Sequence, residues 1–93
     1  MRKLLKEIEQ IPKETKIYQF GSSLINSSPN DIDLLIEYDE KIYHPKIIKK
    51  IYRSTIIRLQ MQLMIPLDVT FLNMLEFKSF THSKKIELTC VYP

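Results

Sequence analysis

The chain of 93 residues contains little glycine and little cysteine. Its one glycine, Gly21, excludes the Gly-rich phosphate loops of the Walker and Rossmann types, because those loops need several glycines. Its one cysteine, Cys90, excludes a disulfide framework and a cysteine-based zinc site, and it indicates a reducing compartment. No apolar run reaches the roughly 20 residues of a membrane span, and Glu7 and Glu9 interrupt the start before a signal-peptide core can form. These absences predict a cytoplasmic protein that makes no use of a membrane.

The chain also lacks a strong excess of either charge. Fourteen Lys and Arg residues against 11 Asp and Glu residues give a formal net charge of +3. This excess suits an anionic ligand such as a nucleotide but is far below that of a dedicated DNA-binding protein, so we expect no nucleic-acid partner. A hydrophobic content of 44% and a charged content of 27% exclude disorder. A length below the usual domain size of roughly 100–150 residues predicts one domain, residues 1–93.

The hydrophobic pattern alternates between helical and strand-like segments. We expect helices at 2–10, 45–64 and 73–80, strands at 16–20, 32–38, 67–72 and 86–92, and a short helix with a loop at 22–30. The strand at 32–38 contains the run Leu34, Leu35 and Ile36, which favours a central place in a sheet. The alternation predicts a small mixed β-sheet flanked by helices, in the α/β or α+β class.

Three aspartates lie at or near the starts of expected strands and are candidate metal ligands. Asp31 and Asp33 are two residues apart at the start of one expected strand, so their side chains share a face. Two ionised carboxylates about 4 Å apart repel by roughly 4 kcal/mol at an effective dielectric constant near 20, so they need a shared proton, a basic neighbour or a divalent cation. Hard oxygen ligands select Mg²⁺ or Mn²⁺. Asp68, on the expected strand at 67–72, would complete a two-metal site for phosphoryl chemistry.

Gly21 and Ser22 follow the expected strand at 16–20 and fit the other half of that chemistry. A glycine at a turn from strand to helix lets the backbone approach a phosphate closely. The Ser22 hydroxyl can then donate a hydrogen bond to a phosphate oxygen. We therefore expect Gly21 and Ser22 to bind phosphates that bridge to the metal ions.

These motifs together resemble a known family. Residues 20–22 are Phe-Gly-Ser and, after eight intervening residues, residues 31–35 are Asp-Ile-Asp-Leu-Leu. This pattern resembles the DNA polymerase beta-like nucleotidyltransferase superfamily, and the chain's size resembles the minimal nucleotidyltransferases within it. The resemblance covers about residues 16–72. It implies a nucleotidyltransferase fold in which the Gly-Ser pair binds the triphosphate, and Asp31, Asp33 and Asp68 hold two Mg²⁺ ions.

The resemblance also implies an activity. A nucleoside monophosphate, most simply AMP from ATP, would pass to an acceptor hydroxyl with release of pyrophosphate. The chain lacks the helical domain with which kanamycin-type relatives hold a small substrate, so a second protein would complete the site or be the acceptor. The resemblance points to the antitoxin of a toxin–antitoxin pair whose partner is a HEPN-type toxin, modified by adenylylation.

Two other interpretations remain open. The chain could be a catalytically inactive binding module that keeps the fold and neutralises a partner by complex formation, which the absence of a basic residue from the loop at 23–30 favours. It could also be a small α/β domain with coincidental carboxylates, an interpretation that a structure with Asp68 far from Asp31 and Asp33 would support.

The expected helix at 45–64 is apolar around more than half of its circumference. A core of this size cannot cover so wide a surface, so we expect an oligomer or a hetero-complex. A basic ridge on the same helix, formed by Lys46, Lys49, Lys50 and Arg53, is interpreted as a solvated face or as a contact with an acidic or polyanionic partner.

Overall fold

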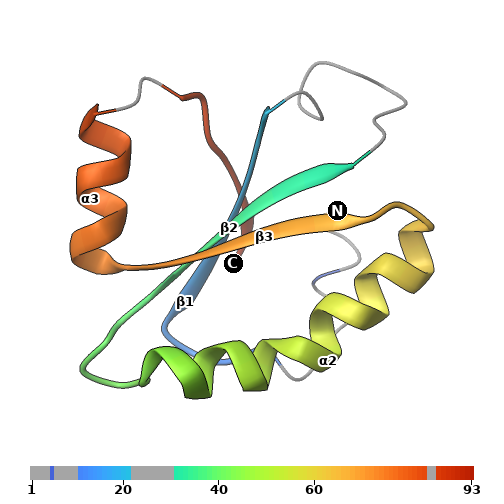
Figure 1. Cartoon of the computed structure of the whole chain (residues 1–93), viewed down its shortest axis with the longest axis horizontal. Coiled ribbons are helices and arrows are strands. Elements are labelled where there is room, and N and C mark those ends of the chain that lie inside the picture. The colour runs from blue at the N-terminus through green and yellow to red at the C-terminus, as the bar shows by residue number, and fades with distance from the viewer. Residues whose placement is uncertain (1–4, 6–10, 22–30, 84–85) are drawn as a thin grey trace.

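The computed structural model describes residues 5, 11–21, 31–83 and 86–93. In these residues the elements are β1 (Thr15–Phe20), β2 (Ile32–Tyr38), α2 (Pro45–Leu63), β3 (Leu67–Asn73), α3 (Met74–Ser83) and β4 (Thr89–Tyr92), as Figure 1 shows. The predicted α+β class is thereby confirmed. The expected helix at 2–10, apart from Leu5, and the expected helix and loop at 22–30 lie outside the described residues. Neither described helix is long and apolar enough to cross a membrane.

The strands form one mixed sheet in the order β3-β2-β1-β4. β2 pairs antiparallel with β1 and parallel with β3, and β4 pairs antiparallel with the other edge of β1. Parallel neighbours need a crossover connection, which α2 supplies between β2 and β3. The apolar strand β2 is therefore internal, as its uninterrupted run of Leu and Ile predicts.

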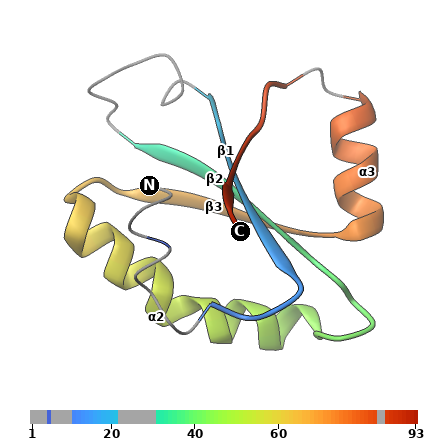
Figure 2. The ribbon, with the colours of Figure 1, turned by 180° about the vertical axis from the view of Figure 1, so that it is seen from behind.

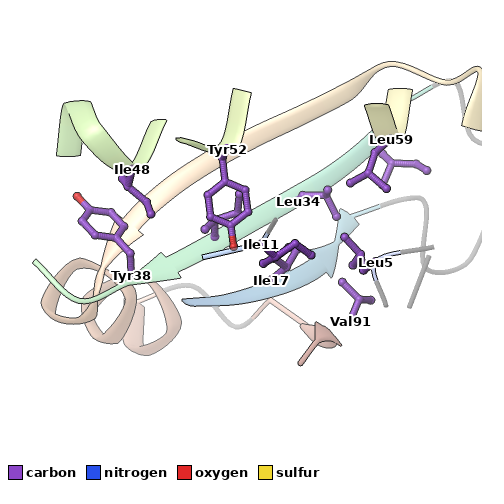
Figure 3. Packing of buried hydrophobic residues seen from close by; sticks show 11 residues of the cluster. Leu5, Ile11, Ile17, Leu34, Tyr38, Ile48, Tyr52, Leu59 and Val91 are labelled. Atoms are coloured by element: carbon purple, nitrogen blue, oxygen red, sulfur yellow. The ribbon is translucent and has the colours of Figure 1, made fainter. Parts of the chain in front are cut away.

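One face of the sheet packs against α2 and forms the main core (Figure 3). Ile48, Tyr52 and Leu59 project from α2 at helical spacing, and all three side chains are buried. Alternate residues of the strands, including Ile17, Leu34, Ile36 and Tyr38, meet them from the sheet, and Leu5 and Ile11 join the same cluster. The Tyr52 hydroxyl shares a buried hydrogen bond of 2.6 Å with Thr15 Oγ1, so its polar atom is satisfied inside this core.

The opposite face of the sheet packs against α3, which stands apart from α2 in both ribbon views (Figures 1 and 2). Tyr18 stacks on Phe77 with ring centroids 4.9 Å apart, and Phe20 meets Phe80 edge to face at 6.2 Å. Leu35 is fully buried on this side, opposite in parity to the core residues of β2. The two helices thus cover different faces: the α2 side of β2 is uniformly apolar, whereas its α3 side carries Asp33 and Glu37 around the buried Leu35.

Six element ends differ from the sequence-based prediction: β1 starts one residue earlier, β3 ends and α3 starts one residue later, and the other three are at the end of α2, the end of α3 and the start of β4. α2 ends at Leu63, because Met64 adopts a left-handed backbone conformation (φ 56°) and caps the helix. α3 continues to Ser83, beyond the expected residue 80. It starts with a reciprocal cap, in which the Asn73 N–H donates to Glu76 Oε1 at 3.0 Å and the Glu76 N–H donates to Asn73 Oδ1 at 2.8 Å. β4 begins at Thr89 rather than at residue 86, since its last partner on β1 is Gln19.

Candidate functional site

The candidate site lies at one end of the strands, where β1 ends and β2 and β3 begin. We call this end of the sheet the acidic edge. The antiparallel pairing of β1 with β2 sets Phe20 opposite Asp33. The parallel pairing of β2 with β3 sets Asp33 opposite Asp68. Neighbouring residues of adjacent strands point to the same face of a sheet, so the carboxylates of Asp33 and Asp68 are adjacent. Asp68 is therefore not distant from Asp33, so the observation that would have supported the third interpretation is not made.

The register that pairs these two aspartates is held by contacts just before β3. The Ile32 N–H donates to the Pro66 carbonyl oxygen at 3.0 Å, which joins the starts of the two strands. The Leu67 N–H donates to Gln60 Oε1 of α2 at 2.9 Å. The end of α2 therefore sets where β3 begins, and with it the position of Asp68. A slip of one residue would move Asp68 to the other face of the sheet.

The electrostatic environment of Asp33 differs from that of its two acidic neighbours. Asp33 is half-buried, whereas Asp31, which immediately precedes β2, and Asp68 are exposed. Burial raises the pKa of the Asp33 carboxyl, and the negative charges of Asp31 and Asp68 raise it further. The edge therefore gathers negative charge around a partly desolvated carboxylate, a condition that a cation relieves.

Gly21 directly follows β1 and approaches Asp33 closely. Its φ of 81° lies in the left-handed region that glycine adopts without strain. A Cβ added at this position would overlap Asp33 Oδ2. The lack of a side chain at Gly21 thus leaves the space that the Asp33 carboxylate occupies. Ser22, the other predicted phosphate-binding residue, lies outside the described residues.

The carboxylate oxygens at this site are the type of ligand that a hard divalent cation prefers. Asp33 and Asp68 present carboxylate oxygens from adjacent strands, and Asp31 contributes to the potential at Asp33. Among the described residues, no three His, Cys, Asp or Glu side chains converge closely enough to form a complete ligand set. We therefore assign the edge as a paired-carboxylate site with a third carboxylate nearby.

A small mixed sheet with adjacent carboxylates beside a strand-ending glycine is an arrangement suited to transfer of nucleotidyl groups. Residues 1–91 match the family model described as a nucleotidyltransferase domain, and the chain belongs to that family. Family membership makes the chain a transferase that uses a nucleoside triphosphate, and such domains generally use divalent metals. Searches of curated proteins and of solved structures gave no match.

The sequence analysis missed the aromatic side chains that border this site. Phe20 is the strand neighbour of Asp33, and Phe80 of α3 packs against Phe20. Both rings lie on the α3 side of the sheet, which is the face that Asp33 shares. Two signals were available in the sequence: the alternation of Tyr18 with Phe20, and the spacing of three residues between Phe77 and Phe80. Without the topology, neither signal shows which face the rings share with the aspartates.

Proposed function

We propose that the protein transfers AMP from ATP to a hydroxyl group of a partner protein, as the antitoxin of a toxin–antitoxin pair with a HEPN-type toxin. The adjacency of Asp33 and Asp68, together with membership of the nucleotidyltransferase family, carries this proposal. The restriction to AMP, to a protein acceptor and to a toxin partner rests on the sequence resemblance alone. A cytoplasmic location fits this role.

In the proposed reaction, the acceptor oxygen forms a bond to the α-phosphorus, and the bond from that phosphorus to the bridging oxygen of the β-phosphate breaks. Pyrophosphate leaves with the bonding electrons, and the acceptor proton passes to the carboxylate of Asp68. Asp31, Asp33 and Asp68 would hold two Mg²⁺ ions, with Mn²⁺ as a substitute, and Gly21 and Ser22 would bind the triphosphate. When bound, the cations would neutralise phosphate charge and lower the pKa of the acceptor hydroxyl.

The test is incubation of the purified protein with α-labelled ATP and Mg²⁺, with and without the product of the adjacent gene. We expect label on the partner, and loss of label with Asp33→Asn or Asp68→Asn. Glu14→Gln is the matched control, because it removes an exposed carboxylate at the opposite end of β1. Binding of Mn²⁺, followed by electron paramagnetic resonance, gives a readout that does not depend on the acceptor.

The alternative proposal is a nucleotidyltransferase-fold module that neutralises its partner by complex formation without catalysis. The incomplete ligand set among the described residues favours it. It would be supported by a tight complex in which no label moves with any of the four nucleotides, and in which Asp33→Asn leaves neutralisation intact. Such a result would refute the catalytic proposal.

A further inference from the structure

The outward side of α2 carries an exposed apolar patch. Four large side chains of this helix and that of its capping residue Met64 are exposed, and together they form what we call the outer patch: Ile47, Ile51, Ile57, Met61 and Met64. Met61 is 74% exposed and Met64 is 88% exposed. The buried residues of α2 lie on the other side of the helix and already form the core, so repacking within this domain cannot cover the patch. A surface of this kind marks an interaction site.

Basic residues lie both inside and beside the outer patch. Lys50 is three residues after Ile47 and seven before Ile57, which places it on the same face of the helix. Arg58 is seven residues after Ile51 and three before Met61, which places it on the same face near the other end of the outer patch. The exposed cations Lys46, Lys49 and Arg53 run along one flank. The helix contains no Asp or Glu, so these charges have no carboxylate partner within α2.

We propose that the outer patch binds an acidic, amphipathic helical segment of a partner protein. Aliphatic residues of that segment would cover the outer patch, and its carboxylates would pair with Lys50, Arg58 and the flanking cations. This inference goes beyond the proposed function, because docking on α2 needs neither a metal ion nor a nucleotide.

The charge pattern disfavours three other occupants. A second copy of this chain packed through the same face would set two purely basic helices against each other. A membrane surface accepts an amphipathic helix whose charges lie apart from its apolar stripe, whereas Lys50 and Arg58 lie within the patch. RNA is recognised largely by stacking on aromatic rings, and the aromatic residue of α2, Tyr52, is buried in the core.

The end of the outer patch lies close in sequence to the candidate site. Met64 is four residues before Asp68, so the chain between them spans at most about 14 Å. Asp33 and Asp68 lie on the face of the sheet opposite α2, so a segment docked along α2 would have to continue past Met64 and around the start of β3 to reach them.

The test uses a labelled peptide of about 20 residues, about the length of α2, with Leu at core heptad positions and Glu beside them. A scrambled peptide of equal composition is the control, and fluorescence anisotropy measures binding. We expect Ile57→Ser/Met61→Ser and Lys50→Glu/Arg58→Glu each to weaken binding at least about tenfold. Met74→Ser/Leu75→Ser, which removes exposed apolar side chains of α3, is the matched control and should leave affinity unchanged. Circular dichroism checks that each variant is folded.

A charge swap makes the test specific. A peptide with Lys in place of Glu should not bind the wild-type protein but should bind Lys50→Glu/Arg58→Glu. Equal binding of the scrambled peptide would overturn the proposal. So would tighter binding to phosphatidylglycerol vesicles or to a uridine oligonucleotide, or self-association in light scattering that Ile57→Ser/Met61→Ser abolishes. Asp33→Asn should leave peptide binding unchanged, so failure here and failure of the proposed catalysis are distinguishable.

Discussion

Replacing Asp33 by Asn should stabilise the metal-free protein. Adjacent strands are about 4.8 Å apart, and two unit charges about 5 Å apart repel by roughly 0.8 kcal/mol in water and roughly 3 kcal/mol at an effective dielectric constant near 20. Because Asp68 is exposed, solvent screening favours the low end of this range, about 1 kcal/mol. For a domain of this size, about 1 kcal/mol corresponds to a rise in Tm of about 4–8 °C.

The measurement is thermal unfolding followed by circular dichroism in chelator-treated buffer at pH 7. Asp68→Asn should also raise the Tm. The Tm of the double variant should rise by less than the sum of the two single effects, because both changes remove the same repulsion between Asp33 and Asp68. Glu14→Gln, away from the site, should leave the Tm unchanged. A lower Tm for Asp33→Asn would refute the reasoning, since the carboxylate would then be a stabilising group.

The pH dependence of this effect follows from the raised pKa of Asp33. Its pKa in the folded protein lies above the ordinary value of an aspartate side chain, so the folded state binds this proton more tightly than the unfolded state. The ionised form at pH 7 therefore costs stability, and protonation removes that cost as the pH falls through the folded-state pKa. The Tm difference between wild type and Asp33→Asn should shrink over the same range.

Two further changes test the core and the turn. Burial raises the pKa of Tyr52 to about 12, so wild-type stability should fall as the pH rises from about 10 towards 12, and less so in Tyr52→Phe. At neutral pH, loss of the hydrogen bond to Thr15 should cost Tyr52→Phe about 0.5–1.5 kcal/mol in urea unfolding, and an unchanged midpoint would contradict this account. Gly21→Ala should lower the free energy of unfolding by at least about 1–2 kcal/mol, because alanine is strained at φ 81° and its Cβ would displace Asp33. Equal stability of Gly21→Ala and wild type would show that the turn relaxes without penalty.

The sequence predicts the elements well because each has a clear local signal. The apolar run at 32–38 indicates an internal strand, and Pro45 and Pro66 bracket the long helix. The sequence names Asp68 as a candidate third carboxylate but cannot establish that it pairs with Asp33, because that pairing depends on a parallel register that contacts between α2 and β3 fix. The roles of the site residues and the single domain at 1–93 stay predictions.

The closeness of Phe20 to Asp33 was beyond sequence reasoning for a related physical reason. Alternation along a strand shows that two residues share a face, but not which residues of other elements meet there. The rings of α3 reach the site because α3 turns back over the face opposite α2. The same reasoning applies to α2, where the sequence shows a wide apolar circumference but not which half becomes core.

The division of α2 into two sides has an evolutionary consequence. Its inner side and its length are constrained, because Tyr52 and Leu59 fill the core and Gln60 helps to fix the register of β3. Its outward residues bear on none of these contacts. Substitutions there can accumulate at little cost to folding or to the acidic edge. The outward side of α2 is therefore free to diverge among related chains while the fold and the acidic edge stay the same.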